Sequence, residues 1–410
     1  MTIQQITPIR QSINVQDLDV FRYKNFELTP FDARVIEFSN RLSKRILSDA
    51  DYGRIPAMTA LAFWLRKTNI KRIVLENQYL THMPHVRLSP IGVVFHICPS
   101  NVDTMFVYSL VISLLMGNKN ILRISNRLDH DYINFLFDVL NSELATEHSA
   151  LMAQYINIVT FNHDKDISTF FSQKANARLI WGGDNTAKTF KEIPANPRTR
   201  DIVFADRISL SIFKTQVFLL QDDTQQKEIV RKFYNDAYTF DQKGCSSPQS
   251  LFLLGSESDN QAFENTFYTI LEKISATQYG GDNASLASLK YNQLINDVID
   301  DKVSHFRNDN TTLYLVETSI QELLHSCGGG YFYTQSIVQL KDILPSIHNK
   351  VQTISYFGLD DADLDYLAHQ TAGIGVDRIV PIGKALAFDY IWDGFNLCEE
   401  LSSKKMVVKG

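Results

Sequence analysis

Short, apolar, β-branched runs alternate with helix-like segments along the first half of the 410-residue chain, and this alternation constrains the fold more than any other feature. The clearest run is Ile91 to Ile97 (IGVVFHI), which has the composition of a strand buried on both faces. Further strands are predicted at Ile121 to Ile124, Ile156 to Thr160 and Ala177 to Trp181, with helices at 128–145 and 165–175. Strands that alternate with helices predict a parallel α/β sheet.

A second α/β unit is predicted to begin near residue 205, because strand patterns resume there. The strands are expected near Ser209 to Phe213, Ser250 to Leu254, Thr353 to Phe357 and Ile379 to Ile382. Residues 1 to about 75 carry amphipathic helix patterns instead, such as the one from Arg34 to Ile46. A chain of this length is expected to form two or three domains.

Composition and charge exclude several classes of protein. A net charge of −6 gives no basic footprint for nucleic acid. The four cysteines form no CxxC pair, which argues against zinc and a disulfide framework and indicates a reducing compartment. The ten histidines show no HxxxH or HExxH spacing, so no metal site is expected. Because no secretory signal follows Met1 and the longest apolar run, Phe106 to Met116, is too short to span a bilayer, we expect a cytoplasmic protein.

Three segments that leave strand ends carry residues suited to ligand binding, because a parallel sheet has its ligand crevice at the carboxyl ends of its strands. They are Pro99-Ser100-Asn101, the segment from Arg123 through Ser125 to Arg127, and Gly182-Gly183-Asp184. The glycine pair lets the backbone approach a phosphate where a helix begins. The GxGxxG signature is absent, and a bare turn between strand and helix explains Gly182-Gly183 equally well.

Cys245 is the candidate nucleophile, in the segment Asp241-Gln242-Lys243-Gly244-Cys245-Ser246-Ser247-Pro248. A cysteine at a glycine-flanked bend, with a lysine nearby, can have a lowered pKa and attack carbonyl groups. Most cysteines are inert and buried, so this residue type alone leaves both interpretations open. Cys98 and Cys398 lie in apolar surroundings and are expected in the core, whereas Cys327 precedes the flexible turn Gly328-Gly329-Gly330. No GxSxG elbow is present, although Ser-His-Asp chemistry is not excluded.

In combination these motifs resemble the aldehyde dehydrogenase superfamily. The order runs from Pro99-Ser100-Asn101, through Gly117-Asn118 with Arg123 and Ser125, to Gly182-Gly183 and Gly244-Cys245. The run from Gly375 to Leu397 (GVDRIVPIGKALAFDYIWDGFNL), with Gln352-Thr353 and Tyr356-Phe357-Gly358, is similar to the acyl-CoA reductase branch of bioluminescence-type fatty-acid reductases. The resemblance extends from about residue 85 to the C-terminus.

The resemblance implies an α/β fold with a Rossmann-type cofactor domain, an α/β catalytic domain and a small oligomerisation element. We expect residues 1–205 to form the N-terminal helices and dinucleotide-binding domain, 206–385 the catalytic domain, and 386–410 a tail that packs back on the cofactor and oligomerisation region. Segments near Tyr79 to Leu88 and Lys404 to Lys409 are expected to reach a neighbouring copy, so a homo-oligomer is expected.

The resemblance also implies a role for each site residue. Cys245 matches the nucleophile that accepts the acyl group as a thioester, and Asn101 matches the oxyanion-hole amide. The residues expected to bind the cofactor are Pro99, Ser100, Arg123, Ser125, Arg127, Gly182, Gly183 and Asp184. Since two arginines and no carboxylate lie between Ile121 and Leu128, the cofactor is expected to be NADPH, with NADH as the alternative.

The departures from the superfamily pattern favour reduction over oxidation. Val203 stands where oxidising aldehyde dehydrogenases carry the glutamate that activates water, and without a positioned base the thioester persists for hydride transfer. Lys188 replaces a glycine of the phosphate turn, and nothing acidic between Cys327 and Gln335 matches the glutamate that holds the nicotinamide ribose.

The predicted function is therefore an acyl-CoA or acyl-thioester reductase that makes a fatty aldehyde. The acyl donor is acyl-CoA or another activated acyl group, and a further expected partner is an acyl-activating synthetase or transferase. The alternatives are a cysteine acyltransferase or thioesterase without redox chemistry, an aldehyde dehydrogenase working in the oxidative direction, and a non-catalytic partner of an acyl-activating enzyme.

Overall fold

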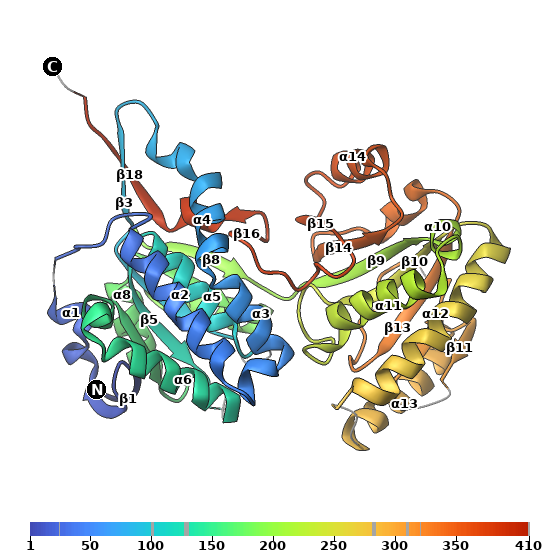
Figure 1. Ribbon diagram of the computed structural model, residues 1–410, viewed down its shortest axis with the longest axis horizontal. Helices are drawn as coiled ribbons and strands as arrows, with labels where there is room; N and C mark the ends of the chain where they lie inside the picture. Colours follow the sequence, from blue (N-terminus) through green and yellow to red (C-terminus); the bar gives the residue numbers. More distant parts are fainter. Residues whose placement is uncertain are drawn as a thin grey trace. The chain divides into compact units, whose positions relative to one another are not determined.

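The computed structural model describes residues 1–23, 25–99, 102–126, 131–280, 284–308, 311–319 and 321–408. The chain divides into two compact units, and the first is built from two separate stretches of sequence (Figure 1). Unit 1 comprises Met1–Ala205 and Phe388–Gly410, whereas unit 2 comprises Asp206–Ala387. Each unit contains one seven-stranded sheet.

The sheet of unit 1 has the strand order β2-β1-β6-β5-β4-β7-β8. Its strands are β1 (Thr2–Thr7), β2 (Gln11–Asn14), β4 (Val93–Ile97), β5 (Lys119–Ile124), β6 (Ile156–Thr160), β7 (Ala177–Trp181) and β8 (Arg200–Phe204). The five strands from β6 to β8 are parallel, and β1 joins them antiparallel. Counted along the chain, these five follow the doubly wound order 3-2-1-4-5, in which the strand order reverses between β4 and β7. The predicted parallel α/β sheet is confirmed.

Helices cover both faces of this sheet, as Figure 1 shows. They are α1 (Asp19–Arg22), α2 (Ala33–Ser48), α3 (Pro56–Trp64), α4 (Lys67–Glu76), α5 (Met105–Leu115), α6 (Asp131–Leu144), α7 (Ala150–Ala153), α8 (Lys165–Lys174) and α9 (Asp184–Glu192). Helix α2 begins where the Asp32 carboxylate accepts a 2.9 Å hydrogen bond from the Arg34 N–H, which is a standard N-cap. The predicted helices at 34–46 and 165–175 are confirmed as α2 and α8; the first residues of the range 128–145 lie outside the described part of the chain.

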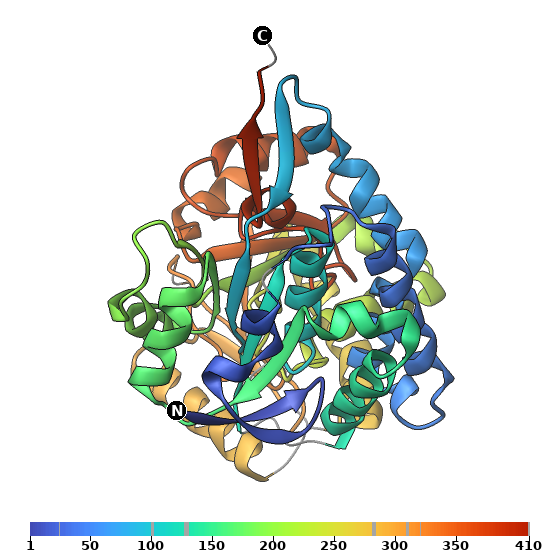
Figure 2. The same cartoon turned by 90° about the vertical axis from the view of Figure 1, so that its left-hand side faces the viewer.

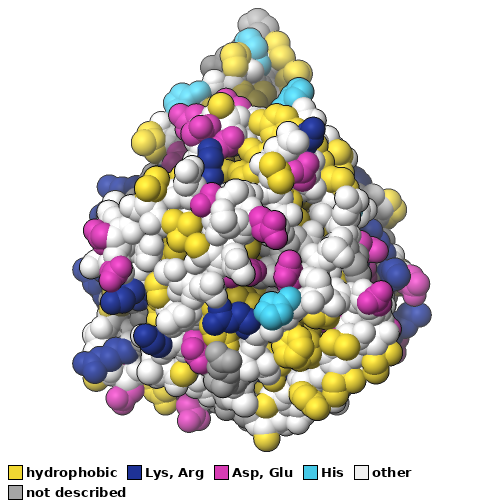
Figure 3. Space-filling model, turned by 90° about the vertical axis from the view of Figure 1, so that its right-hand side faces the viewer, with side chains coloured by type: hydrophobic (Ala, Val, Ile, Leu, Met, Phe, Trp, Pro, Cys, Tyr) yellow, Lys and Arg dark blue, Asp and Glu magenta, His cyan; other side chains and the backbone are white. Residues whose placement is uncertain are grey.

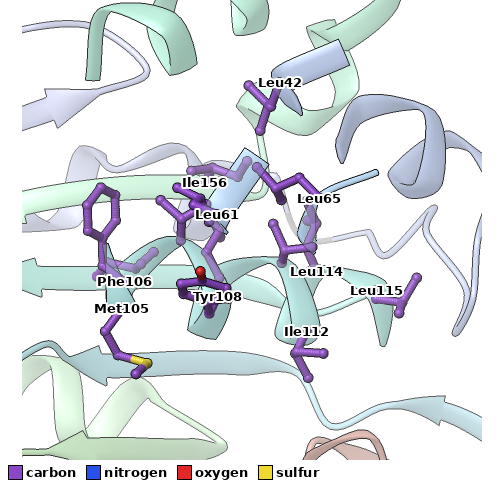
Figure 4. Packing of buried hydrophobic residues seen from close by; sticks show 14 of the residues in the cluster. Leu42, Leu61, Leu65, Met105, Phe106, Tyr108, Ile112, Leu114, Leu115 and Ile156 are labelled. Carbon is purple, nitrogen blue, oxygen red and sulfur yellow. The ribbon is translucent and has the colours of Figure 1, made fainter. Parts of the chain in front are cut away.

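Alternation along β4 explains why this strand has an almost entirely apolar sequence. Val94 belongs to the core on the α5 side of the sheet, whereas Phe95 and Ile97 belong to the core on the opposite side. Every residue of α5 is buried, and Figure 4 shows Phe106, Tyr108 and Leu114 of this helix among side chains of α2 and α3. A helix that is apolar on all sides belongs in the interior of a domain.

A chain of polar groups crosses the core of unit 1. The Trp181 indole N–H donates to Ser109 Oγ at 3.1 Å, Ser109 donates to His96 Nδ1 at 2.7 Å, and His96 Nε2 donates to Asn120 Oδ1 at 3.0 Å. The Asn120 amide in turn donates to backbone carbonyls, so each group has one consistent role and His96 is the neutral Nε2–H tautomer. Burial lowers the pKa of His96 to about 4.

The depressed pKa of His96 predicts a loss of stability on acidification. Between about pH 6.5 and pH 4 the unfolded histidine takes up a proton that the folded one rejects, so the free energy of unfolding falls by about 3 kcal/mol. All three tryptophans (Trp64, Trp181 and Trp392) lie in unit 1, so urea unfolding followed by tryptophan fluorescence reports on this unit. His96→Gln is the control and should have a flatter stability profile over this range. Parallel profiles for the two proteins would contradict the prediction.

The C-terminal segment returns to unit 1. It forms β16 (Ile391–Trp392), β17 (Phe395–Asn396), α15 (Leu397–Glu400) and β18 (Ser402–Met406). Leu397, Cys398 and Leu401 are fully buried in the unit 1 core. Strand β18 pairs antiparallel with β3 (Val86–Pro90) in a separate two-stranded sheet, seen side by side in Figure 2. The two segments expected to reach a neighbouring copy therefore pair with each other within one chain.

The sheet of unit 2 has the order β11-β12-β13-β10-β9-β14-β15 and is parallel except at β11. Its strands are β9 (Ile208–Lys214), β10 (Pro248–Leu254), β11 (His305–Arg307), β12 (Tyr314–Glu317), β13 (Tyr331–Ile337), β14 (Val351–Phe357) and β15 (Arg378–Pro381). The four strands expected here are found as β9, β10, β14 and β15. The helices are α10 (Thr215–Leu219), α11 (Asp223–Tyr238), α12 (Glu257–Gln278), α13 (Ala284–Ile299) and α14 (Asp361–Gln370).

Helix α13 departs from the ordinary surface-helix pattern, because its inner face mixes Leu286 and Leu294 with charged residues and its outer face carries exposed apolar side chains. Its inner face buries Lys290, which donates to the Gly329 carbonyl at 3.0 Å, and Asp297, which accepts from two tyrosine hydroxyls. Its outer face exposes Leu289, Tyr291, Ile295, Val298 and Ile299. Figure 3 shows hydrophobic side chains gathered on the lower part of the face that it views. Polar anchors, in addition to apolar packing, hold this helix to the sheet.

Candidate active site

In unit 1 the candidate cofactor residues follow the strands at the point where the strand order reverses. Pro99 follows β4, Arg123 lies in β5 with Ser125 after it, and Gly182-Gly183 joins β7 to α9. Neighbouring parallel strands end at the same sheet edge, so the structure brings these segments together. Three predicted residues, Ser100, Asn101 and Arg127, lie outside the described part of the chain.

The Gly182-Gly183 turn has the features of a close backbone approach. The Gly182 N–H donates to the Phe204 carbonyl of β8 at 3.1 Å, and a Cβ at Gly182 would lie 3.1 Å from the Thr186 side chain. Gly183 is the N-cap of α9 and has no side chain to cap the helix. Such a start leaves room for an anion at the positive end of the helix dipole. Asp184 lies in the first turn of α9. Its own negative charge interacts favourably with the helix dipole there and would repel a ligand anion that came close to the carboxylate.

Arg123 carries a buried polar group that contacts with the described residues leave unsatisfied. Its Nε is buried without a hydrogen-bond partner among the described residues, and its guanidinium lies 5.1 Å from the centre of the Phe161 ring. Burial lowers the pKa of this group, in line with the loss of water around it. A buried donor without a partner is uncommon and fits a site that expects a polar ligand. The residues present therefore fit a dinucleotide: the glycine turn leaves room for a phosphate, and the arginine offers a hydrogen-bond donor to a polar group of the ligand.

In unit 2 Cys245 lies in the turn between α11 and β10, at the amino end of β10. Cys245 is partly exposed, and its backbone carbonyl accepts a 2.7 Å hydrogen bond from Ser209 Oγ of β9. The Ser247 N–H donates to the Gly244 carbonyl at 2.9 Å, which closes a tight turn around Cys245. A Cβ at Gly244 would lie 3.2 Å from Leu386 Cδ2, so glycine permits the close contact with the segment after β15.

Lys243, the positively charged residue nearest to Cys245 in the sequence, is paired with a carboxylate. Lys243 was expected to support a thiolate, but its Nζ lies 3.6 Å from the Asp241 carboxylate. Both side chains are about half exposed, so their charges partly cancel in water and the lysine contributes less than its position suggests.

Burial dominates the surroundings of the other three cysteines. Cys98 and Cys398 are buried in the core as predicted, and burial raises the pKa of both thiols. Burial also raises the pKa of the half-buried Cys327 to about 11, although Lys290 nearby acts in the opposite direction. A thiol with a raised pKa is rarely ionised at neutral pH, which favours Cys245 over Cys327 as the candidate nucleophile.

Two residues that hold the segment next to the Cys245 turn, Asp236 and Arg378, were missed by sequence reasoning. Asp236 of α11 is nearly buried and accepts hydrogen bonds from the Gly383 N–H at 2.6 Å and the Ala385 N–H at 3.1 Å. Arg378 donates to the Ala385 carbonyl of the same segment at 2.9 Å. The segment that contains Leu386 is thus held by a carboxylate through its amides and by a guanidinium through its carbonyls. No local pattern signals these contacts, because Asp236 and Gly383 lie 147 residues apart.

Over the described residues, no helix has the length and apolar character required to cross a membrane. The same residues contain no group of three or more His, Cys, Asp or Glu side chains able to hold a metal ion.

Comparison with solved structures supports the architecture. The chain is similar to a putative aldehyde dehydrogenase from Burkholderia cenocepacia, with a TM-score of 0.67 and 12% identity over 99% of this chain and 95% of that one. It is also similar to methylmalonate-semialdehyde dehydrogenase from Oceanimonas doudoroffii, with a TM-score of 0.65 and 13% identity over 93% and 86% of the two chains. At these identities the likeness shows the fold, which is that of aldehyde dehydrogenases, as predicted.

Sequence comparison identifies the branch. A curated relative from Aliivibrio fischeri, a long-chain acyl-protein thioester reductase, is 23% identical over 310 residues, which are 73% of this chain. The matched region spans 60% of that relative's length. The family model described as "Acyl-CoA reductase (LuxC)" matches residues 40–403. The chain therefore belongs to the LuxC acyl-CoA reductase family.

Proposed function

We propose that this protein is a cytoplasmic reductase of acyl thioesters that releases a fatty aldehyde through an acyl group on Cys245. The observation that carries the proposal is the partly exposed Cys245 in a turn whose two ends are joined by hydrogen bonds. In addition, Val203 stands where the superfamily resemblance places the water-activating glutamate. The name of the Aliivibrio relative supports a long-chain acyl thioester as donor. The proposed donor is either acyl-CoA or an acyl-protein thioester. An acyl-protein thioester would have to be made by an acyl-activating synthetase or transferase, which would then be a partner of this protein.

In the proposed mechanism the Cys245 thiolate attacks the donor carbonyl, a carbon–sulfur bond to the enzyme forms, and the donor thiol leaves. The Asn101 amide and the Cys245 N–H stabilise the oxyanion. When bound, the reduced nicotinamide supplies the hydride that converts the acyl-enzyme carbonyl to the aldehyde level. The hemithioacetal alkoxide that results collapses: the carbonyl of the aldehyde re-forms, the carbon–sulfur bond to Cys245 breaks, and the electron pair of that bond returns to the sulfur as the thiolate.

We also propose that NADPH is the preferred cofactor, bound by Pro99, Ser100, Arg123, Ser125, Arg127, Gly182, Gly183 and Asp184. The Nε of Arg123, which has no hydrogen-bond partner within the described part of the chain, and the glycine turn before α9 support a polar, anionic ligand. Planar guanidinium groups pair well with a ribose 2′-phosphate. The two-stranded β3–β18 sheet, whose end exposes Met406 and Val408, supports a further proposal that the protein forms a homo-oligomer through this element.

An aldehyde-release assay with acyl-CoA substrates of graded chain length tests the function and the cofactor together. We expect aldehyde to form with a reduced nicotinamide only, and kcat/KM to be higher with NADPH than with NADH. Arg127→Ala should reduce that preference by about tenfold, the effect of one weakened charge-assisted contact of roughly 1.4 kcal/mol. Acyl transfer or thioester hydrolysis that proceeds without a nicotinamide would instead identify an acyltransferase or thioesterase. A wild-type preference for NADH would refute the cofactor proposal.

A further inference from the structure

The turn that carries Cys245 begins in an unusual backbone conformation. Asp241 and Gln242 have φ angles of +52° and +61°, in the left-handed region that residues with side chains rarely adopt. Two such residues in succession persist only where the surrounding structure holds them. The contacts made by this pair therefore determine how the chain enters the turn three residues before the nucleophile.

The side chain of Gln242 links the two ends of this turn. Its exposed fraction is 2%, and its Nε2 donates to the carbonyls of Pro248 at 2.9 Å and Tyr331 at 3.0 Å. Its Oε1 accepts from the Gly330 N–H at 3.0 Å. One carboxamide thus ties the start of the turn to its end, at the first residue of β10, and ties both to β13. Cys245 lies between the two residues that this bond joins.

A glycine turn is shaped to receive the same segment. Gly328, Gly329 and Gly330 all have positive φ angles, and the Gly329 N–H donates to the Asp241 carbonyl at 2.9 Å. A Cβ at Gly328 would lie 2.6 Å from that carbonyl oxygen, closer than the atoms can approach. The triple glycine next to Cys327, which had no assigned role, is therefore fitted to the backbone of the Cys245 turn.

We propose that Gln242 is a positioning residue for the Cys245 nucleophile. It holds the turn closed and so sets the direction and surroundings of the thiol, without itself touching the substrate. The inference rests on the proposed function, in which Cys245 carries the acyl group. A carboxamide is required because the position needs both a donor, for two carbonyls, and an acceptor, for one amide. Glutamate has the same shape but lacks the donor when ionised.

Two variants separate these requirements. Gln242→Glu keeps the length of the side chain and removes the donor. Gln242→Asn keeps the carboxamide, and asparagine tolerates positive φ, but the side chain is one methylene shorter and falls short of Pro248 and Tyr331. Gln293→Ala is the matched control, because Gln293 of α13 also makes three hydrogen bonds in unit 2, to the Cys327 N–H, the His325 carbonyl and the Tyr333 hydroxyl.

The first readout is independent of catalysis: the pH dependence of Cys245 alkylation by iodoacetamide in the full-length protein, located by peptide mass spectrometry. The second is kcat and KM for acyl-CoA reduction. We expect both Gln242 variants to shift the alkylation profile and to lower kcat by about 100-fold, with little change in KM, because a small misplacement of a reacting group has an effect of that size. Gln293→Ala should lower stability and leave the Cys245 profile unchanged.

Alkylation profiles and kcat values of the Gln242 variants that match those of Gln293→Ala would overturn the proposal. If Gln242→Glu fails to fold, Gln242→Asn alone decides, since its backbone and polarity suit the site. A wild-type protein that releases no aldehyde would refute the proposed function, while the alkylation profiles would still show whether Gln242 positions Cys245.

Discussion

Replacing Cys245 with serine is expected to abolish acyl-enzyme formation, with a loss of turnover of about 10⁴–10⁶-fold, as when other enzymes lose their nucleophile. A serine hydroxyl is almost un-ionised at neutral pH and is a far weaker nucleophile than a thiolate. The fold should survive, because the residue is partly exposed and Ser209 contacts its backbone carbonyl, which serine retains. Affinity for the nicotinamide should also remain, since the residues proposed to bind it belong to unit 1.

Labelling with radiolabelled acyl-CoA measures this effect directly, and unchanged circular dichroism and cofactor titration serve as controls. Cys327→Ser is the matched cysteine variant, since Cys327 has the same intermediate exposure and also adjoins a glycine turn of unit 2. It should label like the wild type. Stable labelling that persists in Cys245→Ser and disappears in Cys327→Ser would move the reaction to the other cysteine.

Asn101→Ala is expected to lower turnover by about 10²–10³-fold, the usual result of removing one oxyanion donor. The donor acts on charge that develops in the transition state, so kcat should fall more than substrate affinity. Cys245 should still become acylated, at a reduced rate, in contrast to Cys245→Ser. Single-turnover labelling followed over time separates these two behaviours. Asn101 lies outside the described residues, and the prediction follows from its match to the oxyanion amide of the superfamily; unchanged turnover would remove that assignment.

The four central strands of unit 1, β4 to β7, were predictable because they are largely buried on both faces, whereas the more exposed β1, β2 and β8 were not predicted. The strands Ile156–Thr160 and Ala177–Trp181 agree with the prediction at both ends, since the apolar run stops where each strand leaves the core. The long helix α12 was missed, although Ser256, which accepts from the Asp259 N–H, is a recognisable N-cap signal. Phe263, Phe267 and Leu271 also recur at helical spacing on its buried face, so the sequence carried a helix signal that the prediction did not use.

The sequence indicated which residues belong to the candidate site, but it did not indicate which contacts hold them in place. Motif order indicated Cys245 and the Gly182-Gly183 turn, but the contacts that shape the Cys245 turn join residues far apart in sequence. Gln242 reaches a carbonyl 89 residues away, and its left-handed backbone has no signature in the residue type. Lys243 shows the opposite limit: proximity in sequence suggested support for the thiolate, whereas the side chain pairs with Asp241.

The split of unit 1 into two stretches of sequence has a consequence for synthesis of the chain. Phe388, Trp392, Leu397, Cys398 and Leu401 belong to a core whose other buried members precede residue 206. That core therefore stays incomplete on the ribosome while all of unit 2 is translated. At about 5–20 residues per second, the wait for the remaining half of the chain is on the order of 10–40 seconds. Unit 2, which is continuous, can finish folding first. The nascent N-terminal half must meanwhile expose an apolar surface, and any ribosomal stall before residue 397 prolongs that exposure.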